Sequence, residues 1–393
     1  MKNMKSLKLK IGLLPRIIIA IVLGLLFGMV FPASVVRFFV TFNSIFASFL
    51  FFCIPLIILG LVAPGIADLG KSAGRLLAIT TLIAYGSTLF SGFFTYFSCR
   101  AVFPTLIEPS ATLASVDNPE ASLLAPFFTI DMPPAFGVMT ALILAFILGI
   151  GIAASKGETL KSALTEFKNI IERIISVVII PLLPIYIFGI FLNMSNSGTA
   201  FTVITVFGKI IGVIFTLHIL LLLIQYGIAG VIAGRNPFKL LYNMLPAYMT
   251  ALGTSSSAAT IPVTLAQVKK NGVNKDIADF CVPLCATIHL SGSTMKIVAM
   301  ALAICILIDI PFDIGLFAGF IMMLGIMMIA APGVPGGAIM AAIAVLQSML
   351  GFDEVAIGLI TALYIAIDSF GTACNVTGDG AIAVVVNRIA NKK

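Results

Sequence analysis

The chain has 393 residues, of which 60% are hydrophobic and only 10% are charged, and its mean hydropathy is +1.16. A soluble domain carries roughly one quarter charged residues, so this composition excludes a soluble core and indicates a lipid bilayer. The net charge of +7 does not indicate nucleic-acid binding, because the basic residues form short clusters between apolar runs. The six cysteines lie in apolar surroundings, which argues against a secreted disulfide framework.

Apolar runs of about 20 residues recur along the chain and predict membrane helices, since the strands of an outer-membrane barrel would be shorter and alternating. No small-residue cleavage site follows the N-terminal lysines, so we interpret the first apolar run as a spanning helix and not as a signal peptide. We expect six simple spans, at residues 12–31, 38–67, 74–103, 135–155, 170–194 and 200–234.

The clusters of lysine and arginine should face the cytoplasm. Because residues 236–268 begin and end at basic residues, this apolar segment is expected to enter and leave from the cytoplasmic side as a re-entrant hairpin. Residues 311–350 are flanked by acidic residues and predict a second hairpin from the opposite side. With further spans at 276–308 and 354–388, the prediction is an all-α integral inner-membrane protein with eight transmembrane helices, two re-entrant hairpins and both termini in the cytoplasm.

The two C-terminal segments share one plan, a hairpin followed by a helix, in opposite orientations, which predicts an inverted repeat. Small polar or helix-breaking residues interrupt each element, at 254–260, 289–293, 331–337 and 375–379. Paired interruptions of this kind indicate a transport site near the middle of the bilayer. Freed amides at such breaks favour a carboxylate, whereas freed carbonyls and carboxylates favour a cation.

Two carboxylates, Asp368 and Asp379, lie inside the last apolar run, where a charge is costly and usually functional. They are about three helical turns apart, which would place them on one face of an unbroken helix. The alternative interpretation is that both are structural and are paired with Lys296 or Arg235.

Four segments, TSSSAATIP at 254–262, ATIHLSGST at 286–294, APGVPGGAIM at 331–340 and DSFGTACNVTGDG at 368–380, resemble motifs of the dicarboxylate/amino acid:cation symporter (glutamate transporter) family. The N-terminal half matches only in the number and order of its helices. The resemblance implies a homotrimer in which scaffold helices hold a mobile transport domain. This domain carries the solute across the membrane by an elevator movement. Scaffold helices are expected in 1–73 and 104–199, the third helix of the transport domain in 74–103, and the rest of that domain in 200–393.

The resemblance also implies site residues, with Asp368 holding the amino group of the substrate. The expected substrate contacts are Ser256, Ser257, Ser293, Val334, Gly337, Asp368, Gly371, Thr372 and Asn375. The expected sodium ligands, mostly through backbone oxygens, are Cys285, Thr287, His289, Asn375 and Asp379. Tyr85 and Thr88 fall near another ion site of the family.

Two departures from the family pattern affect these expectations. An amide and an acidic ion ligand are replaced by His289 and Ser291, and the arginine that clamps a side-chain carboxylate is replaced by Gly371. We therefore expect a neutral amino acid to be favoured over an acidic one. Lys296 could share a helix face with His289, and either could replace a bound cation, which would make coupling less sodium-dependent or partly proton-driven. The alternative is a structural ion pair of Lys296 with an intramembrane carboxylate.

These observations favour a secondary transporter that imports a small amino acid or dicarboxylate with sodium, a proton or both. A cation-uncoupled carrier or a channel of the same fold is the alternative. An enzyme is not expected, because no base is placed beside the serines at 255–257. A metal stripe at Cys281, Cys285 and His289 lacks an evident fourth ligand, and His218 is typical of a packed histidine.

Overall fold

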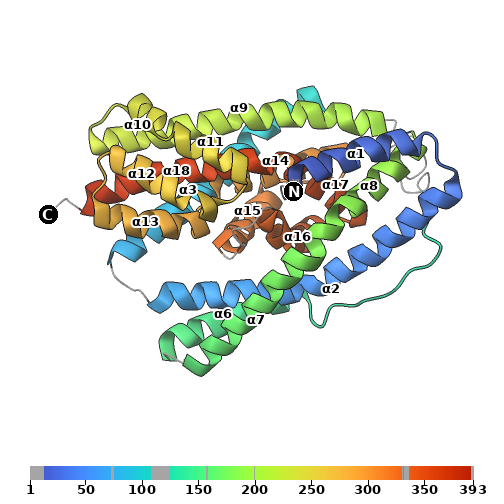
Figure 1. Cartoon of the computed structure of the whole chain (residues 1–393), viewed down its shortest axis with the longest axis horizontal. Helices are drawn as coiled ribbons and strands as arrows, with labels where there is room; N and C mark the ends of the chain where they lie inside the picture. The colour runs from blue at the N-terminus through green and yellow to red at the C-terminus, as the bar shows by residue number, and fades with distance from the viewer. Residues whose placement is uncertain are drawn as a thin grey trace, which may run out of the picture.

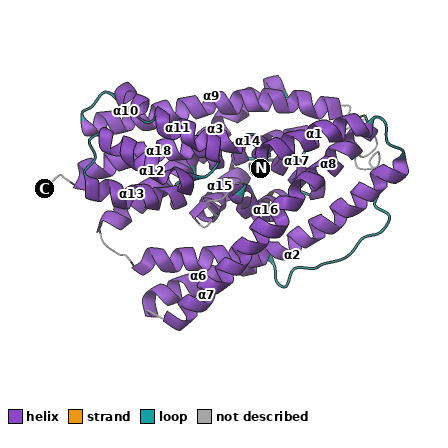
Figure 2. Cartoon of the chain, viewed as in Figure 1, coloured by secondary structure: helices purple, strands orange, loops and turns teal. Residues whose placement is uncertain are grey.

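The computed structural model describes residues 13–71, 75–107, 124–155, 158–198, 200–329, 331 and 336–390. Within these ranges every regular element is a helix, as Figure 2 shows. Six of the described helical segments are long and apolar enough to cross a bilayer. A helix satisfies its own backbone hydrogen bonds without water, so this architecture suits lipid and confirms the all-α class that was predicted.

Most of the N-terminal helices pack against one another. Their bounds are α1 (Leu13–Gly28), α2 (Ala33–Lys71), α3 (Arg75–Leu106), α6 (Val138–Ser155), α7 (Glu158–Ile174) and α8 (Ile180–Asn196). A π-helical segment, η1 (Ile175–Ile179), joins α7 to α8. Helix α2 packs along α6, α7 and α8, while α1 packs along α8. Glycine permits the closest of these approaches, because a Cβ on Gly28 would lie 2.5 Å from the carbonyl oxygen of Leu192.

Helix α9 (Ala200–Ala233) precedes the first predicted hairpin and runs along one long side of the molecule in Figure 1. The hairpin consists of α10 (Pro237–Asn243), α11 (Leu245–Thr254) and α12 (Ser257–Lys270). Its tip is a turn in which Ser255 adopts a left-handed conformation and Ser256 caps α12, accepting a hydrogen bond from the Ala259 amide. The helix, turn and returning helix agree with the hairpin expected at 236–268.

The next predicted span is interrupted where the sequence indicated. Helix α13 (Lys275–Ile288) ends and α14 (Ser291–Leu307) begins on either side of His289 and Leu290. The second hairpin follows as α15 (Ile314–Ile329) and α16 (Gly337–Leu350). Gly336 directly precedes α16 with a φ of 76°, a conformation that favours glycine. Val334, an expected substrate contact, lies outside the described residues.

The last span is broken at a different place from the one predicted. Helix α17 (Glu354–Ala366) and helix α18 (Asp368–Ala390) are separated by Ile367, so the predicted interruption at 375–379 is wrong. The glycines there serve close packing and not unwinding. A Cβ on Gly378 would lie 2.7 Å from Cε1 of His289, and one on Gly380 would lie 2.7 Å from the hydroxyl oxygen of Tyr226.

The two interrupted helices pack against each other. Helix α18 packs against α11, α13, α14 and α9, and nearly all its residues are buried. Figure 1 shows the end of α18 on the same side of the molecule as α10. Residues of the basic segments at 235–239 and 269–275 line a cavity there together with Asn387 and Arg388. This arrangement brings the hairpin tips and both helix breaks to one region.

The packing role of Gly378 gives a test of the fold. We expect Gly378→Ala to lower the thermal unfolding temperature of the detergent-solubilised protein, because the added methyl group would overlap His289 and Gln225 in a close-packed core. Overpacking of this kind costs about 1–3 kcal/mol. Gly212→Ala is the matched control, since its Cβ would meet no atom within 4 Å. Equal unfolding temperatures for the two variants would contradict the packing role.

Candidate functional site

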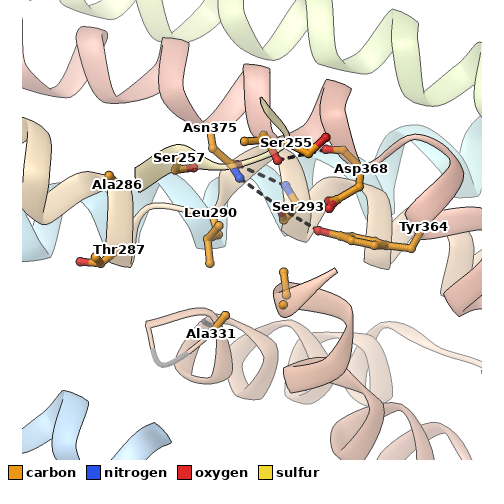
Figure 3. A pocket seen from close by; sticks show the side chains of 13 residues that line it. Ser255, Ser257, Ala286, Thr287, Leu290, Ser293, Ala331, Tyr364, Asp368 and Asn375 are labelled. Atoms are coloured by element: carbon orange, nitrogen blue, oxygen red, sulfur yellow. Dashed lines mark hydrogen bonds between the residues drawn. The ribbon is translucent and has the colours of Figure 1, made fainter. Parts of the chain in front are cut away.

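One pocket lies where the hairpin tips meet the interrupted helices (Figure 3). Its lining residues are Ser255, Ser257, Ala286, Thr287, Leu290, Ser293, Ala331, Gly337, Ala338, Tyr364, Asp368, Thr372 and Asn375. Most of the expected substrate contacts are among them, including residues from both hairpins and from both broken helices. The serine-rich tip and the start of α18 therefore share one cavity, as the inverted-repeat interpretation requires.

Besides α18, which starts at Asp368, three other helices begin at this pocket. The first residues of α12, α14 and α16 are Ser257, Ser291 and Gly337. The N-terminal end of a helix carries a partial positive charge and several amides without an intrahelical partner. Their convergence favours an anionic group such as a carboxylate on this side of the pocket.

Asp368 is the acidic residue of the pocket lining. Its Oδ2 accepts a hydrogen bond from the amide of Gly336 at 2.8 Å, which ties α18 to the second hairpin. Its Oδ1 lies 3.3 Å from Nζ of Lys296. Each carboxylate oxygen can accept a further hydrogen bond, so Asp368 keeps acceptor capacity for a cationic group in the pocket.

Lys296 lies behind Asp368 and does not reach the pocket surface. Its side chain is fully buried, and its ammonium also donates to the carbonyl oxygen of Ile367 at 3.3 Å. The same ammonium lies 3.6 Å from the centre of the Tyr364 ring, within cation–π range. The structure thus has the ion pair that the sequence left as an alternative. The expectation that Lys296 shares a face with His289 is wrong, because the helix ends between them.

Gly371 makes room for this lysine. A Cβ at position 371 would lie 2.3 Å from Cε and 2.6 Å from Nζ of Lys296, so a larger residue would displace the ammonium. Gly371 does not line the pocket. Gly371 therefore has two effects. It leaves the site without an arginine, and its lack of a side chain gives Lys296 room to reach the carboxylate of Asp368.

A small hydrogen-bonded group surrounds Ser293. The hydroxyl of Tyr364 and the amide nitrogen of Asn375 each donate to Oγ of Ser293, both at 3.0 Å. Asn375 Oδ1 in turn accepts from the amide of Gly292 at 2.7 Å. Because the Ser293 oxygen accepts two hydrogen bonds, its own hydrogen is left to donate to a solute.

Asp379 belongs to a separate buried chain of hydrogen bonds. His289 Nδ1 donates to Asp379 Oδ1 at 2.8 Å, and the Nε2 of the same ring lies 3.0 Å from the hydroxyl of Ser87. Gln225 donates to that hydroxyl at 3.0 Å and to the hydroxyl of Ser291 at 3.2 Å. With Nδ1 donating to the Asp379 carboxylate, the Nε2 of a neutral His289 ring accepts from the Ser87 hydroxyl, which in turn accepts from Gln225.

Several of the expected sodium ligands have hydrogen-bond partners within the protein. The carbonyl oxygen of Cys285 accepts from the His289 amide, and the Thr287 hydroxyl donates to the Leu284 carbonyl oxygen. A sodium ion needs several oxygen ligands, whereas the His289 ring presents an N–H to Asp379. The side-chain geometry at Asp379 is that of a histidine–carboxylate pair.

Three other predicted residues lie away from the pocket lining. Ser256 caps α12, as described above. Thr88 donates to the carbonyl oxygen of Ala84 in its own helix, and the hydroxyl of Tyr85 lies 3.5 Å from the Met322 carbonyl oxygen. The residues of α3 that hydrogen-bond to the broken helix include Ser87, described above, and Ser91, which donates to the Ser291 carbonyl oxygen at 2.6 Å.

Sequence reasoning missed Tyr364, Ser87 and Gln225. A signal existed for Gln225, because it is an uncharged polar residue inside a long apolar run, where a buried hydrogen-bond partner is required. Tyr364 lies four residues before Asp368, but the helix breaks between them, so helical spacing does not show that both side chains contact Lys296. Nothing in the spacing distinguishes Ser87 from its polar neighbours on α3.

Comparison with known proteins gives matches over nearly the whole chain. The model of the Sodium:dicarboxylate symporter family matches residues 13–389. The serine/threonine transporter SstT of Acinetobacter baylyi is 25% identical, over 98% of this chain and 99% of the relative. The protein of the same name from Acinetobacter baumannii is 27% identical, over 96% of this chain and 97% of the relative.

The buried pair of His289 and Asp379 can be tested by a double-mutant cycle. We expect His289→Ala and Asp379→Ala each to destabilise the protein, and the double variant to lose at least about 1 kcal/mol less than the sum, because removing one partner leaves the other unpaired. The measurement is unfolding in mixed micelles. His289→Ala combined with Glu172→Gln, on the surface of α7, is the control pair and should be additive within about 0.5 kcal/mol. An additive first pair would mean that the contact contributes nothing.

Proposed function

Because this chain belongs to the Sodium:dicarboxylate symporter family, we propose that it is a cation-coupled secondary transporter that imports a small neutral amino acid. The observation that carries the proposal is the placement of Asp368 in a pocket where three helix N-termini converge. The ammonium group of a zwitterionic solute suits Asp368, and its carboxylate suits the helix N-termini. The family is one of transporters, and the chain is not an enzyme.

The two ends of the solute are assigned by charge. The ammonium group is held by Asp368, which retains acceptor capacity toward the pocket. The carboxylate lies toward the hydroxyls of Ser257 and Ser293 and the amides at the helix starts. Thr372 and Gly337 complete the lining around a small side chain, and Val334 of the second hairpin is retained as a proposed contact.

The absence of arginine at position 371 supports a neutral solute. A second carboxylate would need a bidentate cationic partner facing the pocket, and Gly371 provides none. Lys296 is buried behind Asp368 and is already bonded to it, so it does not take that role. The relatives are named serine/threonine transporters, which supports a small neutral amino acid as the substrate here.

The coupling ion is sodium, a proton or both in this proposal. The family description supports sodium, for which Cys285, Thr287, His289, Asn375 and Asp379 are the proposed ligands through backbone and side-chain oxygens. The pairing of Asp379 with the His289 ring supports a contribution from protons. A cation-uncoupled carrier or a channel of the same fold is the second candidate. Both buried carboxylates already have a partner in the protein, His289 for Asp379 and Lys296 for Asp368, which favours the uncoupled carrier over the channel.

The proposed movement is an elevator, in which a transport domain carries the site across the bilayer against a scaffold. The packing of α1 on α8 and of α2 on α6, α7 and α8 supports a scaffold in 1–73 and 104–199. The packing of α3 on α14, with α9 and α11 on α18, supports a transport domain of 74–103 and 200–393. A homotrimer in the inner membrane, in contact with lipid and with both termini in the cytoplasm, completes the proposal.

Counterflow in proteoliposomes tests the function. Vesicles loaded with unlabelled L-serine should accumulate external tritiated L-serine or L-threonine, and aspartate or glutamate should exchange at least tenfold more slowly, because their second carboxylate finds no cationic partner. Omitting sodium and varying the pH then identify the coupling ion. Ion conductance without counterflow would indicate a channel, and faster exchange of aspartate would reject the neutral-substrate assignment.

Asp368 is the residue on which recognition of the ammonium depends. We expect Asp368→Asn to reduce the rate of serine counterflow by roughly 100-fold, since a charge-assisted hydrogen bond in a desolvated site contributes about 1.5–3 kcal/mol and the lysine would be left unpaired. The rate is compared with that of Glu172→Gln, which removes a surface carboxylate of α7 and should behave as the wild type. Serine counterflow at the wild-type rate in Asp368→Asn would refute the assignment.

A further inference from the structure

We propose that Lys296 is the permanent countercharge of Asp368 and allows the carrier to return across the membrane without a solute. The inference rests on the proposed transport function and adds a role for a residue that does not contact the solute. In this role the ammonium of Lys296 balances the carboxylate of Asp368 when the pocket is empty, so that no bound cation is required for the return step.

The first step is the geometry of the pair. The Lys296 ammonium is fully buried and has three partners within the protein: Asp368 Oδ1, the Ile367 carbonyl oxygen and the face of the Tyr364 ring. A lysine ammonium has three donors, and these partners use them within hydrogen-bond or cation–π distance. The ammonium is therefore held by the protein itself, whether or not the pocket contains a solute.

The second step concerns the space for the pair. The side chain of Lys296 lies against the bare backbone of Gly371, where any Cβ would overlap it. Gly371 is on the first turn of α18, which is also the turn that carries Asp368. One turn of helix thus supplies the carboxylate and the gap through which the lysine reaches it.

The third step is the charge of the site in its two states. An unpaired carboxylate in a low-dielectric interior is strongly disfavoured, and a buried partner removes most of that cost. With Lys296 present, the empty site holds one negative and one positive charge. A zwitterionic solute adds no net charge, so the occupied site has the same balance. Other ionisable side chains near the lysine are Cys374 and His218, and the Nε2 of His218 donates to the Gly292 carbonyl oxygen at 3.3 Å.

Replacing the lysine by an apolar side chain would affect the two states differently. In the occupied site the ammonium of the solute would still lie beside Asp368 and partly balance it. In the empty site Asp368 would be a lone buried carboxylate, and its movement across the bilayer would be opposed. The return of the empty carrier should therefore slow far more than the movement of the occupied one.

Exchange and net transport separate these two states experimentally. Exchange of internal for external L-serine needs only the occupied carrier, whereas efflux into serine-free buffer also needs the empty carrier to return. In Lys296→Met we expect serine exchange within about threefold of the wild-type rate and net serine efflux at least tenfold slower. Lys239→Met removes an exposed lysine at the start of the first hairpin and should leave both rates unchanged.

The possible outcomes are distinct. Equal loss of exchange and efflux in Lys296→Met, or no loss of either, would overturn the countercharge role and leave the proposed function intact. Failure of the wild-type protein to exchange serine or any other amino acid would overturn the proposed function and this inference together. If Lys296→Met is not monodisperse in detergent, Gly371→Ala tests the same pair, because its methyl group would push the ammonium away from Asp368. The same selective loss of efflux is then expected, and unchanged efflux would overturn the role.

Discussion

The structure depends on the requirement that helix ends inside the bilayer find hydrogen-bond partners within the protein. Two helices are broken and two hairpins turn in the core, so backbone amides are exposed at four places where water is scarce. Helix α18 supplies the partners for two of them. Asn375 accepts from the amides at the start of α14, and Asp368 accepts from the amide that precedes α16. Ser256 caps the start of α12 from within its own hairpin. The pocket lies among these capped ends.

The same capping residues are therefore also the residues that face the solute. Asn375 holds the start of α14 with its oxygen and Ser293 with its nitrogen, and both side chains line the pocket. A change at either position would alter the helix junction and the cavity together. This sharing explains why the site is made of short polar side chains, since each must satisfy the backbone and leave one group for the cavity.

The sequence predicted the order of helices and hairpins because loop charge and apolar run length are set by the membrane itself. It predicted the break at His289 and the turn at Ser255, where polar residues interrupt apolar runs. It failed at the last helix, because a glycine that unwinds a helix and a glycine that admits a neighbour look alike in one sequence. Gly378 is of the second kind, and the true break at Ile367 carries no glycine or proline. The partner of Lys296 also depended on this break, so it could not be read from helical spacing.

Gly371 shows how one small residue can alter both the polarity and the charge balance of a site. Its lack of a side chain leaves the pocket without a bidentate cation, and the same gap is filled from behind by the Lys296 side chain. The positive charge is thereby moved from a position where it could bind a solute to one where it binds only the protein. Asp379 follows the same pattern, because the space beside Gly378 is occupied by the His289 ring that bonds to it. In both cases a glycine on α18 and a side chain from the broken helix α13–α14 act together, so each buried carboxylate has a partner that the fold itself provides.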